Sequence, residues 1–255
     1  MSGARSLAAV TAGLLTALTA LTALTGCGTA EDADDTLTVL AAASLTDVFE
    51  ELAARFEDEH PGVEVRLSFG SSTTLAQQVH EGAPADMLAT ADEESMAVAV
   101  DAVGESTPFA TNEIVLVSPA GDDSPVTGLD DLRAPDVDLV MCVPSAPCGV
   151  AAATVLDEAG VLVTPRSLEL DVRAVLAKVV AGEADAGLVY ASDAEAAGSA
   201  VRSYAVTGSA DVRNVYSLAV VEGATSPDLA EEFADLVTGE DGAAVLRDAG
   251  FGAAP

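Results

Sequence analysis

The chain has 255 residues, of which 42 are acidic and 10 are Lys or Arg, and its formal net charge at pH 7 is −32. This balance excludes a nucleic-acid binder, because such proteins neutralise phosphates with clustered Lys and Arg. Half of the residues are apolar and 20% are charged, which provides enough material for a folded core and argues against disorder.

The N-terminal segment has the pattern of an export signal. Arg5 is the only charged residue before Cys27, and an apolar run from Leu7 to Thr25 follows it. A positive start, an apolar stretch and small residues before a cysteine predict a signal peptide over 1–26 with a lipobox that ends at Cys27. We expect Cys27 to be lipidated and to anchor the exported protein to the outer face of the cell membrane. An uncleaved transmembrane anchor is the alternative, because the run is close to the length of a span.

Residues 28–35 are acidic and lack large apolar side chains, which predicts a flexible tether. After it, apolar periodicity predicts a strand and then a helix that begins at Ser44. Ser44 stands at the N-cap position, and Asp47 three residues later gives a pattern similar to a capping box. The following pattern predicts strands and helices in alternation, with strands over 63–69, 86–90 and 112–118 and helices over 75–81 and 92–103.

The same alternation resumes after the Gly/Asp/Pro break at 121–125, which we interpret as the start of a second lobe. The expected helices are 129–133, 150–159, 172–181, 227–237 and 242–248, and the expected strands are 137–143, 186–191, 201–206 and 214–221. Repeated βα units predict an α/β protein with parallel sheets.

With Cys27 assigned to lipid, Cys142 and Cys148 remain as a pair six residues apart. In an exported protein such a pair predicts a disulfide. Two free thiols are the alternative, since so short a loop requires a turn, which Pro144 and Pro147 could supply.

Small polar residues follow several predicted strands, at the starts of predicted helices. They are Ser44, the run from Ser71 to Thr74, and the pair Cys148 and Gly149. Helix starts present unpaired N–H groups and a partial positive charge, so several of them in one crevice would bind an anion without a cation. The alternative is that each hydroxyl merely caps its helix.

Signatures of an enzyme are missing. His60 and His80 have no metal-ligand spacing to each other or to cysteine. A nucleophile elbow, a phosphate-binding P-loop and a dinucleotide fingerprint are also lacking from the sequence. We therefore expect neither an enzyme nor a bound cofactor.

Four motifs together resemble the molybdate-binding protein of ABC molybdate importers. They are Ala41-Ala42-Ala43-Ser44-Leu45, Phe69-Gly70-Ser71-Ser72-Thr73-Thr74-Leu75 with Gly82-Ala83-Pro84-Ala85-Asp86, Asp171-Val172-Arg173, and Leu188-Val189-Tyr190-Ala191-Ser192-Asp193. The resemblance implies a type II periplasmic-binding-protein fold, in which two α/β lobes close on a ligand cleft. We expect lobe 1 to comprise 36–117 plus 218–255, and lobe 2 to comprise 118–217.

The resemblance also implies the ligand contacts. They fall on hydroxyl and backbone N–H groups of Ser44 and Ser72, the N–H of Val172, the phenol of Tyr190 and, at a position where many relatives differ, the N–H of Cys148. Molybdenum would be present only as the bound oxyanion. Because molybdate is fully ionised at neutral pH, its site needs donors only, and every oxygen must be hydrogen-bonded to offset desolvation.

The function implied is that of a monomeric lipoprotein receptor that binds molybdate, and tungstate as well, and delivers it to an ABC permease in the membrane. Sulfate or another tetrahedral oxyanion is the alternative ligand. An enzyme on the same fold is a further alternative, but Tyr190 and Cys148 have no apparent base beside them. Arg173 would either assist the anion electrostatically or form a structural ion pair.

Overall fold

The structure is a computed structural model that describes residues 36–121 and 124–255. The signal peptide predicted over 1–26, the lipidation site Cys27 and the tether predicted over 28–35 lie outside the described residues. Within the described part of the chain, no helix combines the length and the apolar character that crossing a membrane requires.

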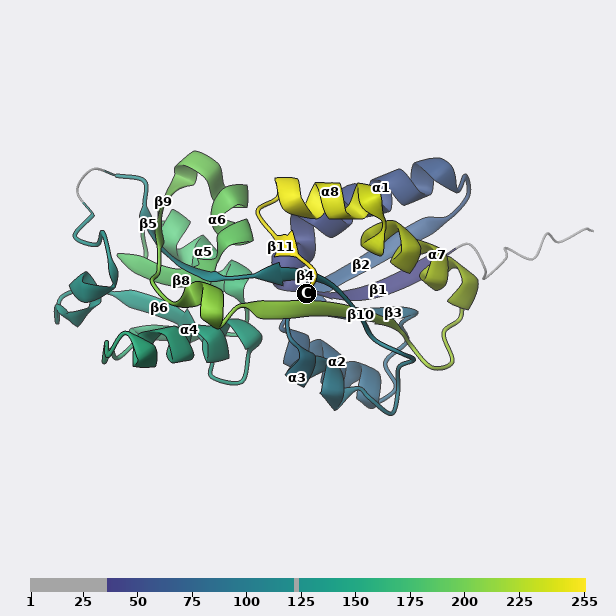
Figure 1. The fold of residues 1–255 in the computed structure, drawn as a ribbon, viewed down its shortest axis with the longest axis horizontal. Coiled ribbons are helices and arrows are strands. Elements are labelled where there is room, and N and C mark those ends of the chain that lie inside the picture. The colour runs from purple at the N-terminus through teal and green to yellow at the C-terminus, as the bar shows by residue number, and fades with distance from the viewer. Residues whose placement is uncertain (1–35, 122–123) are drawn as a thin grey trace, which may run out of the picture. The chain divides into compact units, whose positions relative to one another are not determined.

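The first lobe is built on a six-stranded sheet with the order β11-β4-β10-β3-β1-β2 (Figure 1). The central strands β1 and β3 are buried along nearly their whole length, as expected for strands covered on both faces. The strands are β1 (Thr36–Ala42), β2 (Glu64–Gly70), β3 (Met87–Thr90), β4 (Thr107–Asn112), β10 (Asn214–Val220) and β11 (Gly252–Ala253).

The second lobe is built on a five-stranded sheet with the order β7-β6-β8-β5-β9. Its strands are β5 (Ile114–Pro119), β6 (Leu139–Cys142), β7 (Ser167–Glu169), β8 (Ala186–Tyr190) and β9 (Val201–Ala205). The predicted two-lobed α/β architecture is confirmed by these two sheets.

The prediction of parallel sheets is confirmed only in part, because each sheet also contains antiparallel pairs. β1 is parallel to β2 and β3, but β10 is antiparallel to β3 and β4. In the second sheet β6 is parallel to β7 and β8, whereas β5 is antiparallel to β8 and β9. The physical reason is the connectivity: β5 and β10 enter their sheets by direct passage from the other lobe rather than through a crossover helix.

The chain passes between the sheets twice, from β4 to β5 at Glu113 and from β9 to β10 over 206–213. The expected lobe boundaries at 117/118 and 217/218 therefore need correction. All of β5 pairs in the second sheet and all of β10 in the first, so both passages lie a few residues before the expected positions. Two such passages form a hinge of the kind that closes lobes around a ligand.

Helices cover both faces of the first sheet (Figure 1). On one face Phe49 and Phe56 of α1 pack edge-on against Phe233 of α7, with ring centroids 5.9 and 5.4 Å apart. On the other face Leu75, Val79 and Met96 fill a separate cluster. The helices are α1 (Thr46–Glu59), α7 (Pro227–Thr238) and α8 (Glu240–Asp248) on the first face and α2 (Ser72–His80) and α3 (Glu93–Val98) on the second.

The helices of the second lobe pack around one continuous core. Gly187 lies in the middle of β8, where a Cβ would approach Val175 and Val179 of α5 within 3.0 Å, so its lack of a side chain lets the helix approach the sheet closely. The helices are α4 (Pro147–Glu158), α5 (Val172–Val180) and α6 (Ala191–Ala197), with short 3-10 turns η3 (Leu129–Arg133), η4 (Gly198–Ala200) and η5 (Ser209–Asp211).

Candidate functional site

A pocket lies between the two lobes, and its lining contains all five residues that the sequence singled out as ligand contacts. These five side chains are buried, with exposed fractions between 1% and 4%. The first lobe contributes Ala42, Ala43, Ser44, Gly70, Ser71, Ser72 and Ala91, and the second contributes Ala146, Pro147, Cys148, Asp171, Val172 and Tyr190.

The five residues meet because each lies at or shortly after the carboxyl end of a strand. Ser44 belongs to the 3-10 turn η2 (Ala43–Leu45) after β1, and Ser72 begins α2 directly after β2. Cys148 and Val172 lie in the first turns of α4 and α5, and Tyr190 ends β8. Ligands of open α/β sheets bind at this edge.

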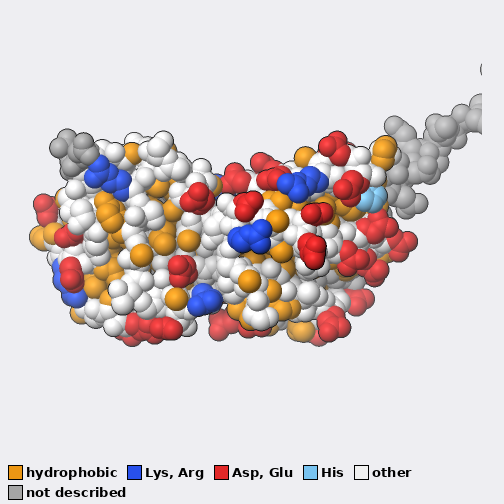
Figure 2. Space-filling model, turned by 45° about the horizontal axis from the view of Figure 1, so that its top comes forward, with side chains coloured by type: hydrophobic (Ala, Val, Ile, Leu, Met, Phe, Trp, Pro, Cys, Tyr) orange, Lys and Arg blue, Asp and Glu red, His pale blue; other side chains and the backbone are white. Residues whose placement is uncertain are grey.

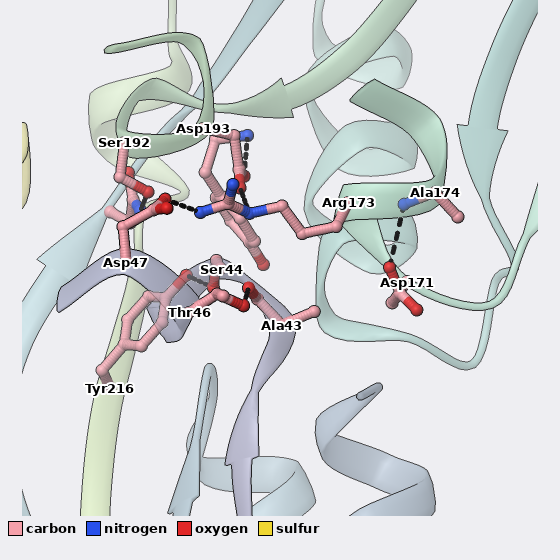
Figure 3. Close-up of polar contacts among 12 residues, drawn as sticks. Ala43, Ser44, Thr46, Asp47, Asp171, Arg173, Ala174, Ser192, Asp193 and Tyr216 are labelled. Carbon is pink, nitrogen blue, oxygen red and sulfur yellow. Dashed lines mark hydrogen bonds and ion pairs between the residues drawn. The ribbon is translucent and has the colours of Figure 1, made fainter. Parts of the chain in front are cut away.

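Ser44 is not the N-cap that its sequence position suggests. The N-cap of α1 is Leu45, which makes no side-chain capping bond, and Thr46 donates its hydroxyl to the carbonyl of Ala43 at 2.7 Å. The Ser44 hydroxyl instead lies 2.8 Å from the phenol oxygen of Tyr216, which reaches it from β10 (Figure 3). If Tyr216 donates in this bond, the proton of Ser44 remains for a ligand.

The Ser72 hydroxyl is held in a similar way. Its Oγ accepts a hydrogen bond from the backbone N–H of Ala91 at 2.9 Å, although Ser72 is the first residue of α2 and could have turned its side chain elsewhere. The bond occupies an acceptor lone pair and leaves the hydroxyl proton to be donated. The alternative that these hydroxyls only cap helices does not describe Ser44 or Ser72.

Backbone donors face the pocket from three helix starts. Ser72 and Val172 are the first residues of α2 and α5, and Cys148 follows Pro147 at the start of α4. The first N–H groups of a helix have no carbonyl partner within it and carry the positive end of the helix dipole. Three such starts around one pocket are the kind of arrangement that can bind an anion with neutral groups.

The start of α4 is fixed by a disulfide and by close packing. Cys142, the last residue of β6, is joined to Cys148 by a disulfide. Gly149 lies so close to the end of the strand that a Cβ would collide with the carbonyl oxygen of Val143. The position of the Cys148 N–H is therefore determined by covalent and steric constraints together.

Tyr190 has a phenol that no described residue satisfies. The residue is 1% exposed, yet its hydroxyl oxygen is buried without a hydrogen-bond partner. Burial, together with the nearby Tyr216, Asp92 and Asp193, raises the pKa of Tyr190 well above its usual value, so the group remains an O–H donor at neutral pH. Burying a polar group without a hydrogen-bond partner costs free energy, so this phenol is a candidate donor to a bound ligand.

The charged residues beside the pocket form an ion-pair chain. Arg173 lies 3.0 Å through Nε from Asp193 Oδ1 in its own lobe, and its Nη2 pairs with Asp47 of the other lobe (Figure 3). Of the two roles expected for Arg173, assisting the anion or forming a structural ion pair, the structure shows the ion pair. Asp171 also lines the pocket, but its Oδ1 accepts a bond from the N–H of Ala174 at 3.0 Å and caps α5.

A second direct contact joins the lobes at the pocket. Thr73 of α2 donates its hydroxyl to the carbonyl oxygen of Ser145 in the second lobe at 2.8 Å. Near the hinge, Asn112 donates to the hydroxyl of Ser192 at 2.8 Å.

Acidic side chains are spread over the face drawn in Figure 2, with few Lys or Arg among them, so the surface field of the protein opposes an anion. Among the described residues no group of three or more His, Cys, Asp or Glu could hold a metal ion.

Sequence reasoning missed the residues that orient the predicted donors. Tyr216 and Ala91 bond the two serine hydroxyls, and Asp47 and Asp193 hold Arg173. No local sequence signal marks them, because each contact joins segments that are brought together only by the fold.

Comparison with known proteins gives concordant results. A family model described as bacterial extracellular solute-binding protein matches residues 37–252. A molybdate-binding protein, ModA, of Mycobacterium tuberculosis is 40% identical over 219 residues, which cover 85% of this chain and 84% of that protein. A putative ABC transporter substrate-binding lipoprotein, YvgL, of Bacillus subtilis is 31% identical, with 96% of both chains covered.

Among solved structures, the periplasmic molybdate-binding protein of Azotobacter vinelandii matches with a TM-score of 0.74 at 22% identity, covering 84% of this chain and 98% of that one. This likeness confirms the type II periplasmic-binding-protein fold.

Proposed function

Because the chain belongs to the bacterial extracellular solute-binding protein family and is similar over most of its length to a molybdate-binding protein, we propose that it captures molybdate in the pocket between its lobes. Membership of this family shows that the chain is a solute-binding protein rather than an enzyme. The relatives named for molybdate support the choice of ligand, since the M. tuberculosis protein is similar over most of both chains.

The observation that carries the proposal is the set of hydrogen-bond donors in the pocket lining, which contains one carboxylate, Asp171, among the described residues. Ser72 can donate because its oxygen accepts from Ala91, Ser44 can donate when Tyr216 is the donor in their bond, and the buried Tyr190 hydroxyl has no acceptor among the described residues. A fully ionised tetrahedral oxyanion has only acceptors to offer, so it would satisfy these groups at once. In a desolvated pocket, hydrogen bonds to a charged group are worth about twice those between neutral groups.

Tungstate has the same charge and geometry as molybdate, and we propose it as a second ligand of the same site. Sulfate is also a tetrahedral dianion, but its shorter bonds place its oxygens closer together, so the same donors would reach them less well. Phosphate carries a proton at neutral pH and needs an acceptor, and the one carboxylate among the described lining residues, Asp171, already accepts a hydrogen bond from the N–H of Ala174 through Oδ1.

We further propose that the protein is an exported monomer, anchored through lipidated Cys27, that delivers its oxyanion to an ABC permease. The lipobox pattern before Cys27 supports the anchor, and so does the similarity to a protein named as a substrate-binding lipoprotein. Lobe closure would be the signal that the permease reads, as in other hinge-closing binding proteins.

Thermal melting of the chain from Gly28 onward, with equal excess of molybdate, tungstate, sulfate or phosphate, tests the ligand. Ligand at 1,000 times its dissociation constant stabilises the folded state by about 4 kcal/mol, which is roughly 8 to 16 °C for a protein of this size. A rise with molybdate and tungstate alone is expected. A rise with sulfate alone would identify sulfate, the alternative ligand, as the one that binds. No rise with any oxyanion would refute the function.

A further inference from the structure

We propose that Asp47 and Arg173 form an ion pair that holds the two lobes closed over the bound anion, which makes Asp47 a positioning residue for the site. The inference rests on the proposed function and deepens it. It concerns the strength of closure rather than the choice of ligand.

The pair spans the lobes next to the pocket (Figure 3). Asp47 lies in the first turn of α1, three residues after the pocket residue Ser44, and Arg173 follows the pocket residue Val172 in α5. A change in the separation of the lobes at the pocket must therefore change the distance between these two side chains.

Arg173 is held in place for this contact from within its own lobe. Asp193 is completely buried, lies 3.0 Å from Nε of Arg173 through Oδ1, and accepts a hydrogen bond from the N–H of Tyr190 through Oδ2. The side chain of Arg173 is only 27% exposed. Less entropy is lost in forming the contact with Asp47 than for a free surface arginine.

The acidic groups around the pair determine how strongly the contact affects closure of the lobes. A neighbouring pocket between the lobes is lined by Asp47 and Asp248 from the first lobe and by Arg173 and Glu195 from the second. Three of these four groups are acidic, so closing the lobes without Arg173 would bring like charges together. Arg173 turns the approach of Asp47 from repulsive to attractive.

Arg173 could instead act on the anion directly, and the two roles predict opposite signs for one substitution. If Arg173 stabilises the anion through its charge, Asp47→Asn removes a competing negative charge and tightens molybdate binding. If the ion pair closes the lobes, the same substitution weakens binding. The general field of this acidic protein also favours tighter binding when any carboxylate is removed, so weakening cannot arise from the field.

The experiment measures molybdate affinity by titration calorimetry and the dissociation rate by competition with tungstate, on wild type, Asp47→Asn, Asp47→Glu and Glu50→Gln. Glu50 is an exposed acid on the same helix and controls for the change in net charge. We expect Asp47→Asn to raise the dissociation constant roughly three- to tenfold, chiefly through faster dissociation. Asp47→Glu should retain most of the affinity, and Glu50→Gln should stay within about twofold of wild type.

Unchanged or tighter binding by Asp47→Asn would overturn the proposal. If wild type binds none of the oxyanions, the proposed function fails separately, and the pair is then decided by small-angle scattering of the ligand-free proteins. A larger radius of gyration for Asp47→Asn than for wild type and Glu50→Gln supports closure by the pair, and equal radii overturn it.

Discussion

Ser72 and Ala91 are joined by a hydrogen bond in which the backbone N–H following β3 donates to the serine hydroxyl at 2.9 Å. The bond links the start of α2 to the end of β3, and it leaves the serine proton available to be donated toward the pocket. The Ser44 hydroxyl is held in a similar way by a hydrogen bond with the Tyr216 phenol. The bond from Ala91 occupies one acceptor lone pair of Ser72, and Tyr216 does the same for Ser44 when Tyr216 is the donor, so that each hydroxyl can give its proton to a ligand.

Replacing Ser72 by Ala should therefore affect both binding and stability. The lost bond to a charged ligand should weaken molybdate binding by about 1.5 to 3 kcal/mol, and the N–H of Ala91 left unsatisfied should lower the free energy of unfolding by about 1 to 3 kcal/mol. Calorimetric titration and melting measure the two effects. Ser118→Ala, which removes another buried serine hydroxyl that lies outside the pocket, is the control and should leave affinity unchanged. Wild-type affinity in Ser72→Ala would contradict the assignment of this donor.

Tyr190→Phe should weaken molybdate binding without lowering the stability of the ligand-free protein. Because the Tyr190 hydroxyl has no partner among the described residues, its removal should leave the ligand-free melting temperature equal to that of wild type or higher. Molybdate binding should weaken by about 1.5 to 3 kcal/mol. Tyr204→Phe, at a partly exposed tyrosine in β9, is the matched control. A large loss of ligand-free stability in Tyr190→Phe would show that the phenol has a structural role instead.

How much of the site can be predicted from the sequence depends on how far apart the interacting residues lie along the chain. Ser44 and Ser72 could be found because a strand end followed by a helix start is a local pattern, whereas Val172 and Tyr190 are implied only by the resemblance to a known family. Tyr216 lies 172 positions from Ser44, and Arg173 lies 126 positions from Asp47, so neither contact has a local signature. Strand direction was missed for the same reason: the apolar run of β5 is equally compatible with a parallel or an antiparallel neighbour.

Short elements also escaped prediction. β7 has three residues, too few for a periodicity, and β4 follows a turn with its first two residues exposed. The start of α2 lies at Ser72 rather than at residue 75, because the polar run that reads as a loop is the first turn of the helix. Helix starts are formed by such small polar residues, which are equally common in loops.

Gly149→Ala should impair binding more than loss of the nearby disulfide. An alanine Cβ would collide with the Val143 carbonyl and displace the first turn of α4, which carries the Cys148 N–H, so we expect at least a tenfold loss of molybdate affinity. Gly128→Ala is the control, since a Cβ there meets no atom within 4 Å.

The double variant Cys142→Ala/Cys148→Ala should lose stability but little affinity. Opening so short a loop should lower the free energy of unfolding by about 2 kcal/mol. The donor at position 148 is a backbone N–H, which the packing of Gly149 still positions, so the dissociation constant should change by less than about threefold. Titration of both variants under the same conditions decides the order, and a greater loss of affinity in the cysteine variant would assign the positioning to the disulfide.

Thr73→Val tests the neutral contact between the lobes. The substitution keeps the branched shape but removes the hydroxyl that donates to the Ser145 carbonyl, so closure should be weaker and molybdate affinity should fall by about 0.5 to 1.5 kcal/mol. Thr74→Val, at the exposed neighbouring position, should have no effect. Equal affinities for the two variants would mean that this contact forms without contributing to closure.

Asp193 should make stability depend on pH. Burial raises the pKa of Asp193 to about 7, while Arg173 opposes the rise. A raised pKa means that the folded state binds this proton more tightly than the unfolded state does. The stabilisation is then complete below the unfolded pKa of roughly 4 and is lost as the pH rises through about 7.

Asn resembles the protonated form of Asp, so Asp193→Asn should match wild type near pH 4, and the excess of its unfolding free energy over that of wild type should grow by roughly 1.4 kcal/mol per pH unit up to about pH 7. Denaturant unfolding of both proteins across this range measures the difference, in which the titration of all other carboxylates cancels. Glu195→Gln, on the same helix but exposed, should follow the wild-type curve. Should Asp193→Asn instead be less stable at pH 8 than at pH 5 relative to wild type, the ion pair with Arg173 would outweigh the cost of burial, and Asp193 would be ionised throughout this range.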